Sequence, residues 1–204
     1  FTMTMFACYD FDNFAFLAVD KQVSMRKTAS NITPAGTIVK LIEHNDFFIT
    51  GCGLQVIIEP VSHDYLVYKD NSDLYTLLKS KYPKELVETT KVVIVPKHPV
   101  QNVRIMFIDF SKDTFSKALR QINGTMQGSK YITVNHREQF EGSANILLSA
   151  NAEQSINKGD FQVFIDSVSS IFSSLATLTS EVSAEFDYVF IFDDGRSYLN
   201  ELPE

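Results

Sequence analysis

The sequence has little cysteine, little glycine and no dense run of basic residues, and each shortage argues against a class of function. The two cysteines, Cys8 and Cys52, lack the spacing of a metal site or a redox pair, so we expect buried reduced thiols. The eight glycines form neither a phosphate-binding loop nor a nucleophile elbow. Reduced thiols are typical of a cytoplasmic protein.

Basic residues are too scattered to indicate a nucleic-acid partner. The formal net charge is -7, and the nearest approaches to a patch are Arg26-Lys27 and Lys79-Ser80-Lys81, both interpreted as solvated surface. The four histidines have no metal-ligand spacing. A tight turn explains Asp193-Asp194-Gly195 better than a metal does. We therefore expect no metal and no cofactor.

Long apolar runs and leader segments are also missing. No stretch of eighteen apolar residues and no charged-then-apolar leader is found, so we expect no membrane span, no membrane partner and a cytoplasmic location. A hydrophobic fraction of 45% with seventeen Phe predicts one packed domain over residues 1–204. Residues 1–3 are interpreted as vector-derived or as part of a precursor, and removal of Met3 would expose Thr4.

Two apolar runs at the start of the sequence predict a β-hairpin. They cover residues 4–10 and 14–25 and flank a turn that contains Asp12 and Asn13. Both runs are rich in Phe, Val, Leu and Ala with little polar alternation. A strand pair covered on both faces is therefore expected.

The rest of the chain alternates between strand and helix patterns. Residues 26–37 are interpreted as a connection, because they contain Asn31, Pro34 and Gly36 among several Ser and Thr. The window 113–122 is ambiguous between helix and strand. A helix capped by Asp160 is predicted from an apolar stripe that runs from Phe161 to Leu178. The other expected elements are a hairpin over 38–43 and 47–50, a helix over 71–83, and strands over 92–95, 103–108, 131–134 and 186–192.

The first hairpin resembles the amino-terminal segment of proteasome β-subunits and of the bacterial proteasome-like peptidase, which are N-terminal nucleophile hydrolases. These proteins begin with Thr on a buried strand and return on a strand that ends in small-apolar-Asp, followed by Gln or Arg, an apolar residue, and Thr or Ser. Residues 18–24, Ala-Val-Asp-Lys-Gln-Val-Ser, are similar to that ending if Thr4 is the first residue. The resemblance continues through residues 36–54 and covers roughly the first quarter of the chain.

The resemblance implies an α+β fold, a four-layer αββα sandwich of two antiparallel sheets between helix layers. It also implies a threonine peptidase that assembles into a ring, cleaves polypeptides and is served by an ATP-dependent unfoldase. In the implied site Thr4 is nucleophile and base, Lys40 lowers the pKa of its amine and hydroxyl, and Asp20 holds Lys40. Gly53 offers its N–H to the oxyanion, and Ser143 matches the serine of the family's small-residue turn.

Each of these residues also has an ordinary interpretation. Thr4 is a plain strand threonine if residues precede it, since an amide nitrogen cannot act as the base. Asp20 alone is a strand-end turn carboxylate, and Lys40 alone is a surface lysine. The connection before Lys40 is several residues longer than in the family, and Ala144 stands where a second glycine is expected. Two alternatives therefore stay open: an inactive proteasome-fold protein with a structural or interaction role, and an unrelated two-sheet binding module.

Overall fold

A computed structural model describes residues 5–10, 13–28, 31–52, 76, 79–84, 87, 91–98, 103–109, 116–121, 158–178, 180 and 182–204. The amino-terminal strands are β1 (Phe6–Asp10), β2 (Phe14–Asp20), β3 (Gln22–Thr28), β4 (Asn31–Thr37), β5 (Ile42–Glu43) and β6 (Phe47–Cys52). The later elements are β7 (Lys91–Pro96), β8 (Val103–Asp109), β9 (Ser116–Gln121), α5 (Phe161–Leu178), β10 (Phe186–Phe192) and β11 (Ser197–Leu199). The strands predicted over 92–95, 103–108 and 186–192 are confirmed, and the ambiguous window 113–122 contains a strand.

The predicted first hairpin is the centre of a four-stranded antiparallel sheet. β1 pairs with β2 from Phe6 opposite Val19 to Asp10 opposite Ala15. β10 pairs with the other edge of β2, which gives the order β1-β2-β10-β11. Every residue of β2 is buried, as expected for a strand without polar alternation. The second arm ends at Asp20 rather than continuing to Met25.

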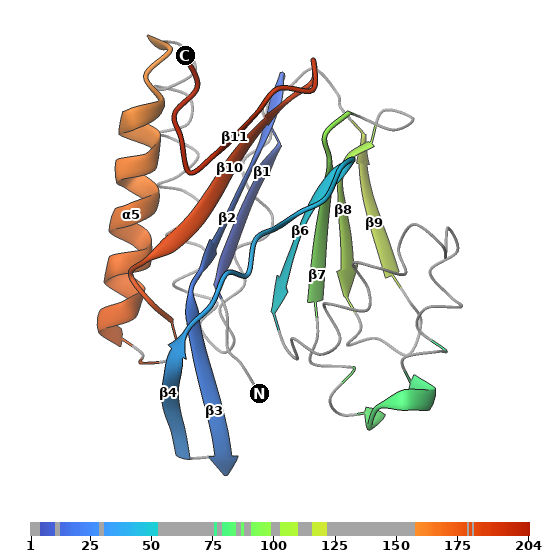
Figure 1. Ribbon diagram of the computed structural model, residues 1–204, viewed down its shortest axis with the longest axis vertical. Helices are drawn as coiled ribbons and strands as arrows, with labels where there is room; N and C mark the ends of the chain where they lie inside the picture. Colours follow the sequence, from blue (N-terminus) through green and yellow to red (C-terminus); the bar gives the residue numbers. More distant parts are fainter. Residues whose placement is uncertain are drawn as a thin grey trace.

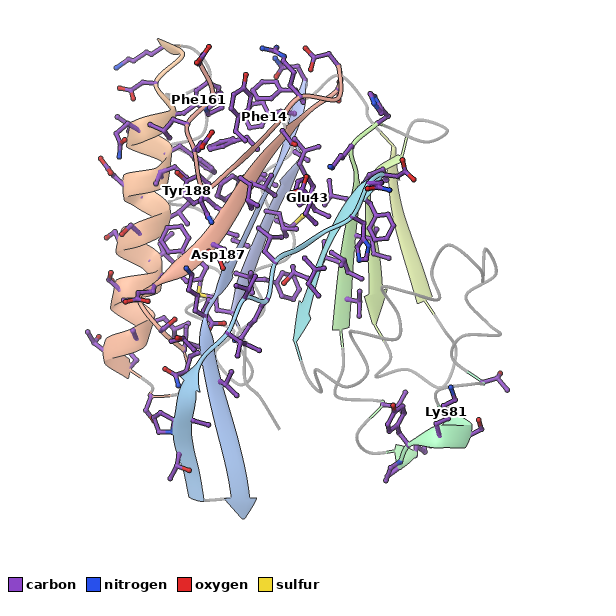
Figure 2. The ribbon with its side chains drawn as sticks, in the orientation of Figure 1. Phe14, Glu43, Lys81, Phe161, Asp187 and Tyr188 are labelled. Carbon is purple, nitrogen blue, oxygen red and sulfur yellow. The ribbon has the colours of Figure 1, made fainter. Side chains whose placement is uncertain are left out.

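Helix α5 covers one face of this sheet (Figure 1). Asp160 caps the helix, because its Oδ1 accepts the N–H of Val163 at 3.3 Å. Figure 2 shows Phe14 and Phe161 lying against each other between sheet and helix, with ring centroids 5.7 Å apart. The buried stripe of α5 consists of Phe164, Val168, Ile171, Phe172 and Leu175.

The apolar residues of α5 serve to pack the helix against the sheet. Among the described residues α5 is the one helix whose length and composition would allow it to cross a bilayer. The sequence argument against a span was therefore too strong on composition alone, since serines interrupt the helix without making it polar. The buried stripe lies on the sheet, as in the core helix of a globular domain.

A second sheet faces the other side of the first. Its order is β5-β6-β7-β8-β9, and all neighbours are antiparallel. The core between the two sheets joins Leu17 and Val189 of the first to Phe48 and Val93 of the second, with Cys8 as a buried thiol. Full burial of each large apolar side chain contributes about 1.5–3 kcal/mol, so this face holds the sheets together.

Residues 26–37 were wrongly interpreted as a connection. β3 and β4 form an antiparallel ribbon that runs from Gln22 opposite Thr37 to Thr28 opposite Asn31, with two register shifts. Pro34 and Gly36 suggested a loop, yet both lie within β4. Among the described residues β4 has a partner strand on one side only, which is where a strand tolerates such residues. The second predicted hairpin is present as β5 and β6. Its first arm is shorter than the predicted 38–43 and its second arm extends beyond the predicted 47–50.

The described residues show helix, sheet and sheet as successive layers (Figure 1). The fold is therefore α+β, with a helix on one outer face of two packed sheets. A helix layer on the far face, the single domain over 1–204 and the strand over 131–134 fall on residues outside those described and stay predictions. Thr76 and residues 79–81 are helical, in agreement with the helix expected over 71–83.

Candidate functional site

Asp20, at the end of β2, is a fully buried carboxylate. Its Oδ1 accepts the N–H of Met5 at 2.8 Å, and its Oδ2 accepts the N–H of Gln22 at 2.9 Å. The N–H of Ser183 lies 3.5 Å from Oδ2, at the limit of a hydrogen bond. Three separate segments thus direct backbone donors at one carboxylate, which is how a buried charge is tolerated.

Lys40 completes this arrangement from the segment between β4 and β5. Its Nζ lies 3.0 Å from Asp20 Oδ1 and 3.1 Å from Oδ2. The Lys40 side chain is only 8% exposed, whereas the preceding Val39 is 67% exposed. The interpretation of Lys40 as a surface lysine is therefore wrong, and the predicted proximity of Lys40 and Asp20 is what the structure shows.

The pair lies directly beside the beginning of β1. Asp20 and Met5 are joined twice, because the Asp20 N–H donates to the Met5 carbonyl at 3.0 Å while the Met5 N–H donates to the carboxylate. Met5 is itself fully buried. The donated N–H belongs to the peptide bond that follows Thr4. Thr4, Gly53 and Ser143 lie outside the described residues, so their proposed roles stay predictions.

The electrostatics of the pair are set by burial. Burial raises the pKa of the Asp20 carboxyl above its usual range, and Lys40 and the N–H groups of Met5 and Gln22 oppose this rise. Its neighbours therefore offset only part of the cost of desolvation. Loss of any one neighbour favours the protonated form.

Within the described part of the chain, Lys21 and Lys40 each form an ion pair near this end of the sheet, and Lys40 is the one that pairs with Asp20. Lys21 Nζ lies 2.9 Å from Asp187 Oδ1, and Asn200 Nδ2 donates to the same oxygen at 3.1 Å. Asp187 is 4% exposed and belongs to β10. Lys21 and Lys40 therefore neutralise different buried carboxylates, which leaves Lys40 as the cation of the candidate site.

Ser183 is a residue of the site that the sequence analysis missed. Its Oγ accepts the N–H of Lys21 at 3.0 Å and donates to the carbonyl of Glu185 at 2.6 Å. It lies just before β10, and β10 pairs with β2 so that Phe186 is opposite Asp20. Only the pairing of β10 with β2 brings Ser183 to the Asp20 end of the sheet, and Ser183 and Lys21 are 162 positions apart in the sequence.

The arrangement is an ammonium group fixed beside the first described residues of a buried strand. Among the described residues no group of three or more His, Cys, Asp or Glu is placed to hold a metal ion. In general, an ammonium group favours the unprotonated form of a neighbouring amine and the ionised form of a neighbouring hydroxyl. The described part of the site is thus a buried ion pair that contacts the backbone of Met5.

The comparisons with known proteins concern the fold. No family model matches the sequence, and no curated protein matches it. Among solved structures the chain is similar to eukaryotic HslV from Trypanosoma brucei, with a TM-score of 0.50 and 11% identity over 93% of this chain and 99% of that one. It is also similar to Anbu, an ancestral beta-subunit from Yersinia bercovieri, with a TM-score of 0.60 and 12% identity over 97% of this chain and 87% of that one.

These likenesses show a proteasome-like fold. At identities of 11% and 12%, the similarity supports a shared fold and assigns no role to any individual residue. The fold that the first quarter of the sequence implied is thus found at this coarse level over nearly the whole chain.

Proposed function

We propose that this protein is a threonine peptidase of the proteasome-like type, which hydrolyses peptide bonds with Thr4 as an N-terminal nucleophile. The observation that carries the proposal is the buried Lys40–Asp20 pair, which touches the backbone of Met5. A buried pair that is solely structural is costly to keep, since apolar residues of similar volume often serve as well. A reactive amine and hydroxyl at Thr4, the residue before Met5, would give the pair a catalytic role.

The proposed reaction is acyl transfer followed by hydrolysis. The α-amine of Thr4 takes the proton of its own hydroxyl, and Oγ attacks the carbonyl carbon of the scissile peptide bond. The Gly53 N–H donates to the resulting oxyanion, and the C–N bond breaks as the leaving amine takes the proton. Water then hydrolyses the ester and restores Thr4. Ser143 is proposed to assist proton movement at the site.

Lys40 and Asp20 have distinct tasks in this scheme. The ammonium group of Lys40 lowers the pKa of the Thr4 amine, so that a larger fraction is unprotonated near neutral pH. Asp20 holds Lys40 in place and keeps it protonated. Ser183 and Gln22 are positioning residues, because they contact Asp20 or its neighbours through backbone and side-chain hydrogen bonds.

Assembly and surroundings belong to the same proposal. The proteasome-like neighbours suggest ring-forming oligomers, and we extend that to this chain. Polypeptide is the proposed substrate, an ATP-dependent unfoldase the proposed partner, and the cytoplasm the proposed location. None of these depends on a cofactor.

The second candidate is an inactive proteasome-fold protein with a structural or interaction role. It is favoured by the extent to which Asp20 is already used, since both carboxylate oxygens accept backbone N–H groups in addition to Lys40. Such a carboxylate joins β1, β2 and the segment before β5 with or without chemistry at Thr4.

Intact mass and covalent trapping separate the two candidates. The natural protein should begin at Thr4, and a β-lactone or peptide epoxyketone should add once, at Thr4, as located by peptide mass spectrometry. Thr4→Ala should abolish the adduct, whereas the matched variant Thr2→Ala, prepared in the precursor, should leave it unchanged after processing. A mature chain that begins elsewhere, or one that forms no adduct, would favour the inactive candidate.

A further inference from the structure

The β3–β4 ribbon is a two-stranded sheet, separate from the four-stranded and five-stranded sheets. Its strands pair with each other and, within the described residues, with no other strand. Figure 1 shows the ribbon projecting beyond the end of the four-stranded sheet. Residues 33–37 of β4 are exposed. An isolated two-stranded hairpin is marginally stable in water, so a surface that covers the ribbon would stabilise it.

The ribbon also differs from the rest of the protein in charge. Residues 22–37 contain Arg26 and Lys27 and no Asp or Glu. The segment therefore carries +2, which leaves -9 for the remainder of a chain whose total is -7. Arg26 lies opposite Ile32, close to the last pair of the ribbon, Thr28 and Asn31. The two basic residues thus stand near the projecting end, on an otherwise acidic protein.

The edge of β4 is poorly suited to adding a further strand. Pro34 has no N–H to donate, and the ribbon has register shifts between Val23 and Ser24 and between Arg26 and Thr28. Features of this kind protect an exposed edge from strand pairing. Contact through the ribbon is therefore expected to depend on side chains and charge.

We propose that the β3–β4 ribbon docks on the acidic body of a neighbouring copy of this chain. Two basic ribbons repel each other, so the contact joins the ribbon to a different surface of the next copy. Such a heterologous contact closes into a ring when the rotation between copies allows it. The inference rests on the assembly part of the proposed function and is independent of peptide hydrolysis.

Charge reversal tests the inference with a matched control in the same chain. The test variant is Arg26→Glu with Lys27→Glu. The control is Lys79→Glu with Lys81→Glu, which changes the net charge equally; both control lysines are exposed, and Figure 2 shows Lys81 apart from the ribbon. Sedimentation velocity and native mass spectrometry measure association over a range of concentrations, and near-ultraviolet circular dichroism checks folding.

The ribbon variant should weaken association at least about tenfold, because contacts of opposite charge become contacts of like charge. The control should associate like the unchanged protein. Raising the salt from about 0.1 M to about 1 M shortens the screening length from about 10 Å to about 3 Å. It should weaken association of the unchanged protein and of the control, and should not weaken association of the ribbon variant. Equal association of both variants, or an unchanged protein that is monomeric throughout, overturns the inference.

Cross-linking identifies the docking surface directly. A photoreactive residue replaces the exposed Thr33, and light and heavy isotope forms of the protein are mixed. Cross-links should join light to heavy chains and should connect Thr33 to acidic segments outside residues 22–37. Cross-links between two ribbons, or within one chain only, contradict the proposal. Failure of Thr4 to form an adduct would remove the peptidase and leave this result unaffected.

Discussion

The two ends of the four-stranded sheet are built differently. At one end the N–H of Asp193 donates to the carbonyl of Asn13, and the ion pair between Arg196 and Asp194 has side chains 60% and 54% exposed. At the other end the pair formed by Lys40 and Asp20 has side chains 8% and 0% exposed. The two pairs have nearly equal N–O distances, 2.8 Å and 3.0 Å. Their surroundings therefore decide what each does.

The pKa directions show the same contrast. The pKa of Asp194 is lowered, first by the backbone N–H of Arg196 and then by its side chain, as for a carboxylate that stays in water. The pKa of Asp20 is raised, because burial outweighs Lys40 and the backbone donors. Water solvates the Asp194 carboxylate, whereas Lys40 and backbone N–H groups take the place of water around Asp20. A carboxylate kept under such conditions is a stronger pointer to function than an exposed one.

The largest expected effect is loss of the buried cation. Lys40→Met leaves Asp20 without its cation in a dry site and should destabilise the protein by about 3–5 kcal/mol. Urea unfolding followed by circular dichroism measures this. At the other end Arg196→Met should leave the unfolding midpoint unchanged within error, since solvent replaces the lost partner. Adding Asp20→Asn to Lys40→Met should restore part of the loss, and a purely additive double variant would contradict the coupling.

The exposed end should nevertheless be sensitive in its backbone. Gly195 has a φ of 90°, and a Cβ placed there would overlap the His98 ring. Gly195→Ala should therefore cost about 1–3 kcal/mol, measured by thermal and urea unfolding. Adding His98→Ala should recover the steric part and leave the conformational part. If Gly195→Ala were as stable as the unchanged protein, the close approach of His98 would be wrong.

Two serines allow a smaller comparison. Ser183→Ala removes an acceptor for the Lys21 N–H and a donor to Glu185 and should cost about 1–2 kcal/mol. Ser174→Ala, on the exposed face of α5, removes only a bond to the Ser170 carbonyl and should cost less than about 0.5 kcal/mol. Equilibrium unfolding of both variants decides whether Ser183 supports the Asp20 end. Equal losses of stability in the two variants would show that Ser183 does not stabilise the Asp20 end of the sheet.

The smallest effect is the difference in titration. Carbon NMR of the carboxyl groups should place Asp20 above the ordinary value of 3.8 and Asp194 below it. Added salt should move Asp194 toward that value and leave Asp20 nearly unchanged. In Lys40→Met the pKa of Asp20 should rise further, since the cation that lowers it is gone. A pKa of Asp20 below 3.8 would contradict the burial argument.

The stability consequence of the Asp20 shift has a definite sign. Asp20 binds its proton more tightly in the folded chain than in the unfolded chain. Its contribution to folding is therefore most favourable below the unfolded pKa and declines as pH rises through the folded pKa. Asp20→Asn should flatten that part of the stability curve, which urea unfolding across pH measures.

Long, strongly patterned segments were predictable from the sequence. The first hairpin followed from uninterrupted apolar runs, and α5 followed from its stripe and its Asp160 cap. The proximity of Lys40 to Asp20 was also predicted, through the family resemblance of residues 18–24, which contain Asp20, and of residues 36–54, which contain Lys40.

Segments without a clear period were not predictable. The β3–β4 ribbon was missed because Pro34 and Gly36 are typical of loops, and only pairing with β3 gives that segment a structure. Ser183 was missed because its position depends on the pairing of β10 with β2, which no local pattern encodes. Strand pairing between distant segments is thus the part of the structure that local sequence patterns do not predict.

The central claim is that the ammonium group of Lys40 acts on the amine at the beginning of β1. The most direct test is the pKa of the Thr4 α-amine, measured by nitrogen NMR in protein that begins at Thr4. An unperturbed α-amine has a pKa of about 7.7–8.0. The account predicts a value below that range, rising toward it in Lys40→Met. An ordinary pKa that does not respond to the loss of Lys40 would contradict the account.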